Sequence, residues 1–208
     1  PIYLGRLDEA EASYRQAVAL KPDFVEAHIN LGNTLKDLGR LDEAEASYRQ
    51  AIVPKPDLAE AHCNLGVALK ELGRIDEAEV SLKEAIALRP DYAEAHYNLG
   101  VTLRELGRLD EAEASYRQAT TLEPNFAEAH NNLGNTLKEL GRLGEAETSY
   151  LQAIAIEPDL AEARSNLGVL LFESKKYDQA AEHFELSDTR ISKRFAIQCS
   201  YLQDEAST

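Results

Sequence analysis

The chain has 208 residues and a formal net charge of −15, with 37 acidic side chains against 22 basic ones. This excess of acid argues against nucleic acid or an anionic membrane surface as a partner, because phosphate binding needs clustered Lys and Arg. No apolar run approaches the length of a bilayer-spanning helix, and the two cysteines, Cys63 and Cys199, share no motif. These properties predict a soluble, cytoplasmic protein without a disulfide framework.

The sequence is a tandem repeat with a period of 34 residues, the interval from Asn30 to Asn64. Units of this length stack in a line and bury a core only against their neighbours, which favours binding by a surface over catalysis in a pocket. Two landmarks define the period. Asn-Leu-Gly starts at Asn30, Asn64, Asn98, Asn132 and Asn166, and Gly-Arg-Leu or Gly-Arg-Ile starts at Gly5, Gly39, Gly73, Gly107 and Gly141.

In chain order, residues 1–24 hold the second half of a truncated repeat, so we expect the chain to be a fragment of a longer protein. The periodicity then predicts four full repeats, at 25–58, 59–92, 93–126 and 127–160, and a degenerate repeat at 161–188. Residues 189–208 are predicted to form a capping helix and a tail. The apolar positions of this helix are Ile191, Phe195, Cys199 and Leu202.

Residues 59–92 show how one repeat is built as two antiparallel helices. Asp57 with Glu60 predicts a capping box that starts the first helix. Gly73 suits the left-handed residue that follows a helix, and Pro90 terminates the second helix because proline lacks an N–H. The apolar residues of each helix recur at intervals of three and four, which places them on one face.

The second helix of the repeat is predicted to start at another capping box, formed by Asp76 with Glu79. Gly144 stands where the other repeats have aspartate, so this later helix is expected to lose its cap at a small cost. Pro54 replaces a leucine or isoleucine, so its helix should end early and leave residues 53–58 the weakest internal joint.

Small residues are expected to permit close packing within the stack. A glycine inside the first helix costs roughly 1 kcal/mol against alanine, and its recurrence suggests that close helix approach offsets the cost. The glycines are Gly32, Gly66, Gly100, Gly134 and Gly168, with alanines in the second helix at Ala44, Ala78, Ala112, Ala146 and Ala180. Large residues should fill the space between one helix pair and the next, at Tyr48, Leu82, Tyr116, Tyr150 and Phe184.

These residues and spacings resemble the tetratricopeptide repeat over positions 1 to 188, with Leu-Gly, Asp-Glu-Ala, Tyr, Ala and Pro in the family's order. The family's tryptophan is replaced by His28, His62, His96 and His130. The resemblance implies an all-α, right-handed superhelical solenoid of antiparallel helix pairs, whose first helices line a concave groove for peptides or partner helices.

The recurring asparagines are the sharpest candidates for binding, because they lie well inside the first helix, where asparagine is unfavourable. Their positions predict a ladder of amides able to hold the backbone of an extended peptide. The ladder is similar to that of the O-linked N-acetylglucosamine transferases. Two alternatives remain: the amides bond to one another between repeats, or duplication copied a neutral residue.

Other residues on the same helices complete the predicted peptide-binding set. A basic row, Lys36, Lys70, Arg104 and Lys138, could read charged side chains of a ligand, although such rows are commonly solvated faces. The position before each asparagine varies, as Ile29, Cys63, Tyr97, Asn131 and Ser165, which would tune the ligand or reflect relaxed constraint. The full candidate set is Asn30, Asn33, Asn64, Asn98, Asn132, Asn166, Lys36, Lys70, Tyr97, Arg104, Asn131, Asn135 and Lys138.

The same pattern excludes several activities. Family members that clamp the C-terminal carboxylate of chaperones carry lysine just before the asparagine, a place that holds no lysine here, and a glutamate near each helix start would repel an acidic tail. The histidines lack partners at metal-ligand spacing, so we expect no metal, no cofactor and no catalytic residue. The histidines are instead expected to be buried or half-buried spacers.

Three functions are compatible with this pattern. The first is a scaffold for protein binding that holds a neutral or basic extended segment in the groove. The second is the substrate-recruiting arm of a larger enzyme, of glycosyltransferase or oxygenase type, with its catalytic domain outside this chain. The third is end-to-end self-assembly through the unpartnered half repeat at residues 1–24.

Overall fold

The computed structural model describes residues 2–187, which form eleven α-helices and no strand, as the repeat pattern predicts. The predicted capping helix in residues 189–208 lies outside the described residues. The chain divides into two compact units, residues 1–107 and 108–208. The helices are α1 Ile2–Leu20, α2 Val25–Asp37, α3 Leu41–Ile52, α4 Ala59–Glu71, α5 Ile75–Leu88 and α6 Ala93–Glu105 in the first unit, and α7 Leu109–Leu122, α8 Ala127–Glu139, α9 Leu143–Ile156, α10 Ala161–Glu173 and α11 Tyr177–Ser187 in the second.

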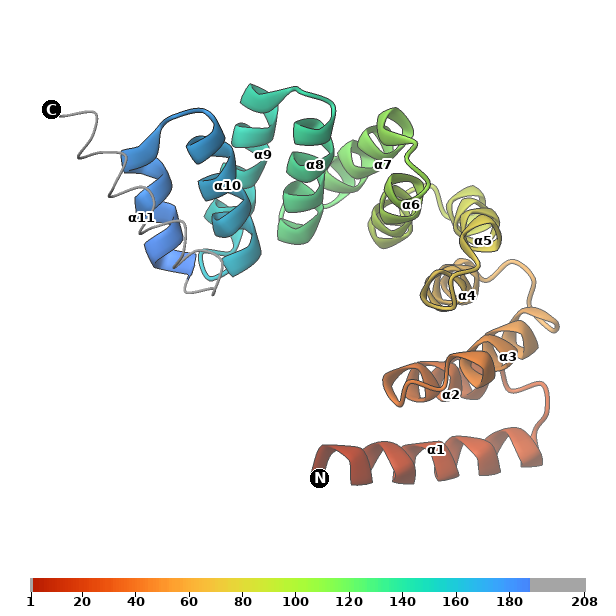
Figure 1. Cartoon of the computed structure of the whole chain (residues 1–208). Helices are drawn as coiled ribbons and strands as arrows, with labels where there is room; N and C mark the ends of the chain where they lie inside the picture. Colours follow the sequence, from red (N-terminus) through yellow and green to blue (C-terminus); the bar gives the residue numbers. More distant parts are fainter. Residues whose placement is uncertain (1, 188–208) are drawn as a thin grey trace, which may run out of the picture. The chain divides into compact units, whose positions relative to one another are not determined.

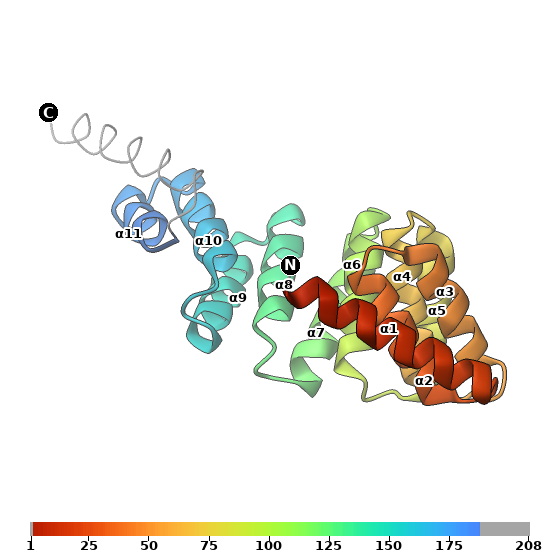
Figure 2. The same ribbon diagram turned by 90° about the horizontal axis from the view of Figure 1, so that it is seen from below.

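Within the units α2 packs against α3, α4 against α5, α8 against α9 and α10 against α11 as antiparallel pairs joined by tight turns, as Figures 1 and 2 show for α2 with α3 and for α10 with α11. The turn after α4 is typical. Gly73 has a φ of 77°, and Arg74 N–H donates to the carbonyl of Leu69 at 2.9 Å, which closes the helix end in a Schellman motif. Gly5 differs, because it lies inside the continuous helix α1.

The expected close approach at the helical glycines is confirmed. A Cβ built at Gly134 in α8 would lie 2.6 Å from Cε1 of Tyr150 in α9, and one built at Gly32 would lie 2.5 Å from Cε1 of Tyr48. Both tyrosines are fully buried. Ring packing against a bare helix backbone therefore compensates for the poor helix propensity of glycine.

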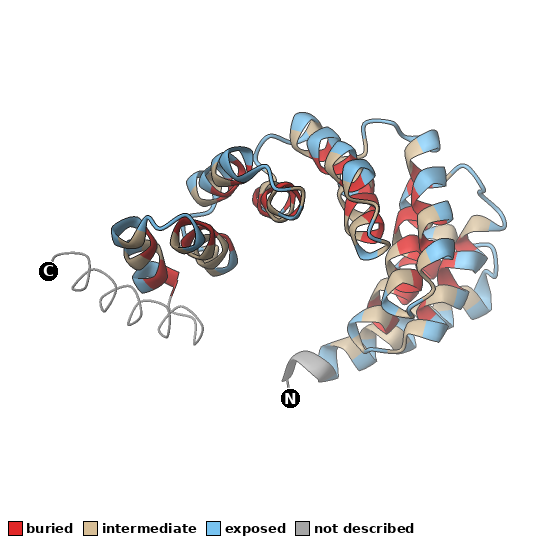
Figure 3. Cartoon of the chain, turned by 45° about the horizontal axis from the view of Figure 1, so that its top comes forward, coloured by how far each residue is buried: buried red, intermediate tan, exposed pale blue. Residues whose placement is uncertain are grey.

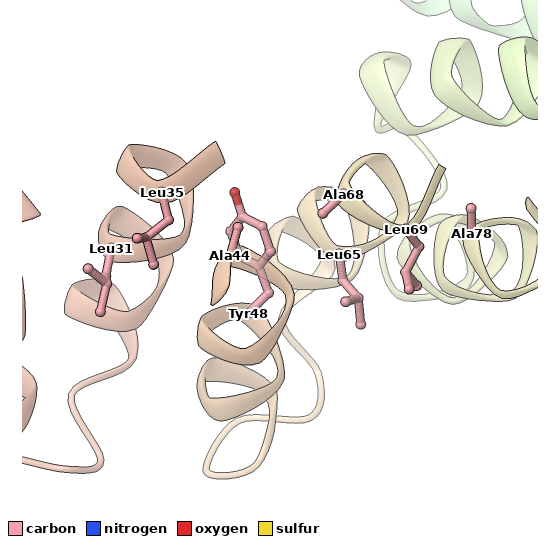
Figure 4. Close-up of a cluster of buried hydrophobic side chains, with 8 residues drawn as sticks. All are labelled: Leu31, Leu35, Ala44, Tyr48, Leu65, Ala68, Leu69 and Ala78. Carbon is pink, nitrogen blue, oxygen red and sulfur yellow. The ribbon is translucent and has the colours of Figure 1, made fainter. Parts of the chain in front are cut away.

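Within each unit the buried residues lie on the facing sides of the helices (Figure 3). In the first unit Tyr48 of α3 lies between the leucines of α2 and the first helix of the next pair (Figure 4). The cluster comprises Leu31, Leu35, Ala44, Tyr48, Leu65, Ala68, Leu69 and Ala78. Because it extends beyond one helix pair into the next, a single repeat cannot bury this core alone.

The predicted capping boxes are wrong. Helix α4 begins at Ala59 with Leu58 as its N-cap, and α5 begins at Ile75 with Arg74 as its N-cap, and neither cap has a side-chain hydrogen bond. Asp76 lies one residue inside the helix, so it can act only through the helix dipole.

The predicted effect of Gly144 fails for the same reason. Arg142 is the N-cap of α9, so Gly144 does not replace a capping residue. Asp42 and Asp110, which stand in the corresponding place, lie inside the first turns of α3 and α7.

The expected early end of the helix before Pro54 is confirmed, since α3 ends at Ile52 after 12 residues whereas α5, α7 and α9 each have 14. Val53, the residue after this helix, is 73% exposed. We expect amide exchange to be faster at residues 53–58 than at residues 87–91, because fewer backbone hydrogen bonds and apolar contacts hold that joint. Equal protection of the two segments by hydrogen-exchange mass spectrometry would contradict this.

The turn of the last repeat offers a stabilising substitution. Lys175 replaces the usual glycine and has a φ of 60°, a left-handed conformation that costs a side chain about 1 kcal/mol. Lys175→Gly is therefore expected to raise the free energy of unfolding by about that amount. Lys175→Ala serves as the control, because alanine retains the Cβ and should give little gain. Equal denaturation midpoints for the two variants would show that backbone strain is not the cause.

Candidate functional site

The side of the first helices that carries the recurring asparagines forms a polar surface, the asparagine face. In the first unit it comprises Asn30 and Asn33 of α2, Asn64 of α4 and Asn98 of α6. In the second it comprises Asn132 and Asn135 of α8 and Asn166 of α10. Asn30 is exposed and the others are half-buried, so each presents part of its side chain to solvent.

In the first unit Asn33 joins two repeats. Its Oδ1 accepts a hydrogen bond from the hydroxyl of Tyr48 at 2.8 Å and from Nδ2 of Asn64 at 3.2 Å. Burial raises the pKa of the Tyr48 hydroxyl, and the nearby carboxylates of Asp37 and Glu71 add to the shift, so the group remains a donor. The core tyrosine therefore orients Asn33, and Asn33 orients the ladder residue of the next repeat.

The next step of this ladder uses a thiol. Nδ2 of Asn98 donates to Sγ of Cys63 at 3.9 Å, a weak hydrogen bond that again reaches back to the preceding repeat. Cys63 is fully buried, and burial raises the pKa of its thiol to about 12. The thiol is therefore protonated and unreactive, which makes it a packing residue.

The second unit repeats the arrangement with amides. Oδ1 of Asn131 accepts from Nδ2 of Asn166 at 3.0 Å, while Nδ2 of Asn131 donates to Oε1 of Glu162 at 3.1 Å. Asn135 accepts from the hydroxyl of Tyr150 at 2.8 Å, as Asn33 does from Tyr48 in the first unit. Inter-repeat hydrogen bonding, one of the two alternatives left open by the sequence, is thus present in both units.

The variable position before each asparagine is mostly buried. Ile29, Cys63 and Asn131 are 6%, 0% and 2% exposed, whereas Tyr97 and Ser165 are half-buried. Variation at the three buried positions changes packing and the hydrogen-bond partner of the next asparagine. This favours the interpretation that the position adjusts contacts between repeats.

The basic row occupies the last turn of α2, α4, α6 and α8, whereas α10 has no basic residue there. Lys36, Lys70, Arg104 and Lys138 all lie there, half-buried, where a positive charge stabilises the helix dipole. Nζ of Lys138 also pairs with Oε2 of Glu173 in the next first helix at 2.9 Å. A structural role thus accounts for these residues, and contact with a ligand remains a prediction.

The histidines fix the loops between repeats, a role that the sequence analysis missed. Nε2 of His28 lies 2.8 Å from the carbonyl oxygen of Pro22, and the three later histidines repeat this contact at 2.9 to 3.1 Å with Pro56, Pro90 and Pro124. Because the acceptor is a carbonyl, Nε2–H is the donor. Arg164 replaces histidine in the last repeat and donates to Pro158 at 2.7 Å. The constant interval of six residues from proline to histidine was the available signal.

The second helices carry a ladder of ion pairs between repeats, which the sequence analysis also missed. Arg74 donates to Glu45 of the preceding repeat at 2.7 Å and to Glu77 at 2.6 Å. Arg40 joins Glu11 and Glu43 in the same way, Arg142 joins Glu113 and Glu145, and Lys176 pairs with Glu147. The recurring interval of 29 residues, as from Glu45 to Arg74, was visible in the sequence but has no meaning until the helices are stacked.

This ladder predicts a loss of stability in acid. Hydrogen bonds from Arg74 hold the pKa of Glu77 below its usual 4.5, so the pair stabilises the fold above that pH and is lost as the pH falls through the lowered folded value. We expect Arg74→Gln to flatten the decline of the thermal midpoint below pH 4.5. Lys55→Gln, which removes an exposed loop charge, should leave the wild-type slope unchanged. Parallel slopes for all three proteins would contradict the role of the pair.

The described residues contain no group of three or more His, Cys, Asp or Glu side chains placed to hold a metal ion. None of their helices combines the length and the apolar character needed to cross a membrane.

Stacked helix pairs with these turns and glycines define a tetratricopeptide-type repeat protein. Residues 2–196 match the family described as the cilia and flagella-associated protein 70 C-terminal domain, and the chain belongs to this family. No curated protein matches the chain.

Solved structures support the fold. The crystal structure of MamA is 29% identical, with a TM-score of 0.68, and the match covers 77% of this chain and 94% of that one. TTC0263, a thermophilic tetratricopeptide protein of Thermus thermophilus, is 28% identical, with a TM-score of 0.65 and coverage of 83% and 97%. YrrB, described as a tetratricopeptide protein with an unusual peptide-binding site, is 22% identical, with a TM-score of 0.68 and coverage of 87% and 96%, which bears on the fold alone.

Proposed function

We propose that the chain is a protein-binding scaffold whose asparagine face holds an extended peptide or partner segment. The observation that carries the proposal is the bonding of the ladder residues. Asn64, Asn98 and Asn166 each use Nδ2 to bind the preceding repeat. This contact fixes the side chain and leaves Oδ1 available on a partly exposed face, where it can accept a backbone N–H.

The proposal narrows the role of the amides. The sequence suggested that each asparagine offers a donor and an acceptor, and in Asn64, Asn98 and Asn166 one of the two Nδ2 hydrogens is engaged within the chain, which leaves the other hydrogen and Oδ1 for a ligand. A peptide would therefore meet amides whose orientation is already fixed, which lowers the entropic cost of binding. Asn131 is assigned a supporting role, because its amide contacts Glu162 and Asn166 and it is almost fully buried.

Charge indicates the kind of segment. The net charge of −15 and an exposed glutamate in the first turn of each first helix, such as Glu60 and Glu94, favour a neutral or basic partner. YrrB shares this fold and is described as having a peptide-binding site, which supports the proposal. The proposal assigns no catalytic step to the chain, and a cytoplasmic location stays a prediction.

The proposal is tested with decapeptides. Dye-labelled peptides of positive, zero and negative net charge are ranked by fluorescence anisotropy, and the tightest is titrated against Asn64→Ala plus Asn98→Ala. Loss of two hydrogen bonds of about 1 kcal/mol each predicts an affinity about 30-fold weaker. Asn125→Ala, in the exposed turn before α8, is the matched control and should bind normally. Unchanged affinity in the double variant would refute binding through the amides.

A further inference from the structure

A cleft on the other side of the first unit is built by the second helices. It lies between α3 and α5 over the side of α4 that carries His62 and Leu65, and it has a volume of about 450 Å³. Ile52 and Val53 form one wall and Val80 the other. The volume falls in the range of about 300–1,000 Å³ that is typical of ligand-binding clefts. The cleft shares no residue with the asparagine face.

The repeat itself provides a comparison. The corresponding cleft one repeat earlier, between α1 and α3 over α2, is lined by Arg15, His28, Leu31, Ala46, Ser47 and Gln50 among others, and its volume is about 190 Å³. The larger cleft has Val80 where the smaller has Ala46, and Glu84 where the smaller has Gln50. The site therefore arises where this repeat departs from its neighbour.

Pro54 explains the enlargement. It ends α3 two residues earlier than the equivalent helices end, and the shortened helix leaves Ile52 and Val53 at its open end. Val53 is 73% exposed and Val80 is 69% exposed. Valines at such positions gain little from folding, because they remain largely in water, whereas a partner that covers them would gain from burial.

The charges at the rim indicate the partner. Arg49 is already held by Glu45 at 2.9 Å and lies 3.7 Å from Glu77. Glu84 lines this cleft, Asp76 lines its extension along α5, and neither forms an ion pair among the described residues. The uncompensated charge at the rim is therefore negative. The chain's own charge of −15 disfavours a second copy as the occupant.

We propose that this cleft binds a basic amphipathic segment of a partner protein, which places branched aliphatic side chains between Val53 and Val80 and lysine or arginine beside Glu84. The segment is separate from the peptide proposed for the asparagine face, since the two sites share no residue. The scaffold then holds two partners, or two parts of one partner, at the same time.

The test uses an acetylated and amidated dodecapeptide of alanine and lysine that carries two leucines one helical turn apart. Anisotropy titration of the dye-labelled peptide, with backbone amide NMR shifts, should locate binding at α3 and α5. Val53→Ala plus Val80→Ala restores the alanines that stand in these places in other repeats, Ala87 and Ala46, and should weaken binding at least about tenfold. Both valines are exposed, so the fold is retained, and circular dichroism checks this.

Three controls complete the design. Leu151→Ala removes a comparable apolar side chain, 46% exposed in the second unit, and should leave affinity unchanged. Glu84→Gln installs the residue that the smaller cleft has, and should weaken binding about threefold and reduce its dependence on salt. A peptide with glutamate in place of lysine should not bind.

Other outcomes overturn the proposal. These are absence of binding by the wild-type chain at millimolar peptide, affinity unaffected by the paired valine variant, and NMR shifts confined to the asparagine face. Self-association that the paired valine variant abolishes, measured by sedimentation, would assign the cleft to a second copy of the chain instead.

Discussion

Gly134→Ala is expected to destabilise the second unit by about 1–3 kcal/mol, although alanine is the better helix former by about 1 kcal/mol. The new methyl group would lie 2.6 Å from the ring of Tyr150, and the ring cannot retreat, because it is fully buried and its hydroxyl is bonded to Asn135. Overpacking therefore outweighs propensity.

The same substitution at Gly144 should have the opposite sign. Gly144 lies in the first turn of α9, and a Cβ there would meet no atom within 4 Å. Alanine should then add up to about 1 kcal/mol of stability through helix propensity alone. Urea denaturation of the two variants compares an identical chemical change within one unit. A gain at both sites would show that Tyr150 moves freely and that the close approach is not a constraint.

Asn131→Asp is expected to cost about 2–4 kcal/mol at neutral pH. The substitution removes the donor to Glu162 and places a second carboxylate against it, at a position that is only 2% exposed. Burial and the neighbouring charge would raise the pKa of the introduced carboxyl in the folded state. A raised folded pKa favours the protonated form, so the cost should grow as the pH rises above about 4, the unfolded value, and shrink in acid.

The measurement is the free energy of unfolding of variant and parent from about pH 4, near the unfolded pKa, to neutral and mildly alkaline pH. Asn30→Asp makes the same change at an exposed place and should stay within about 0.5 kcal/mol of the parent. A pH-independent difference for Asn131→Asp would mean that the amide matters for its shape alone. Equal effects at both asparagines would remove the distinction between the supporting and the exposed members of the ladder.

The repeat period predicted the helix pairs and identified both the small and the large residues of the core, with the large residues expected between one pair and the next. The structure adds a contact within the pair, because a Cβ at Gly66 of α4 would lie 2.6 Å from Cγ of Leu82 in α5. The register of the repeat identifies both residues of such a contact, but their meeting within one pair depends on the helix geometry.

Helix starts were predicted less well. The capping-box pattern at Asp76 and Glu79 is a local signal, but the Schellman turn at Gly73 already fixes the chain, and the helix starts at Ile75, ahead of the expected cap. The turn at Gly73 thus determined where the helix starts, against the local preference for a cap at Asp76. Glu79 is used elsewhere, paired with Lys83 at 2.7 Å in the following turn.

The candidate site was predicted by position but not by bonding. The repeat period predicted that Asn64 and Asn98 lie in register. The hydrogen-bond partner of each amide depends instead on a residue of the preceding repeat, Asn33 for Asn64 and Cys63 for Asn98. These partners occupy different positions in their repeats, at intervals of 31 and 35 residues. No single spacing rule gives both, so the bonding required the geometry of the stack.

The ion-pair ladder has a consequence for how such a chain can change length. The repeats present a basic residue at one edge and a glutamate at the other, so Arg40 meets Glu11 just as Arg74 meets Glu45. An in-frame deletion of residues 25–58 would bring Arg74 to the place of Arg40, opposite Glu11, and restore a matched pair. Removal or addition of one whole repeat in this way keeps complementary charges at the new junction.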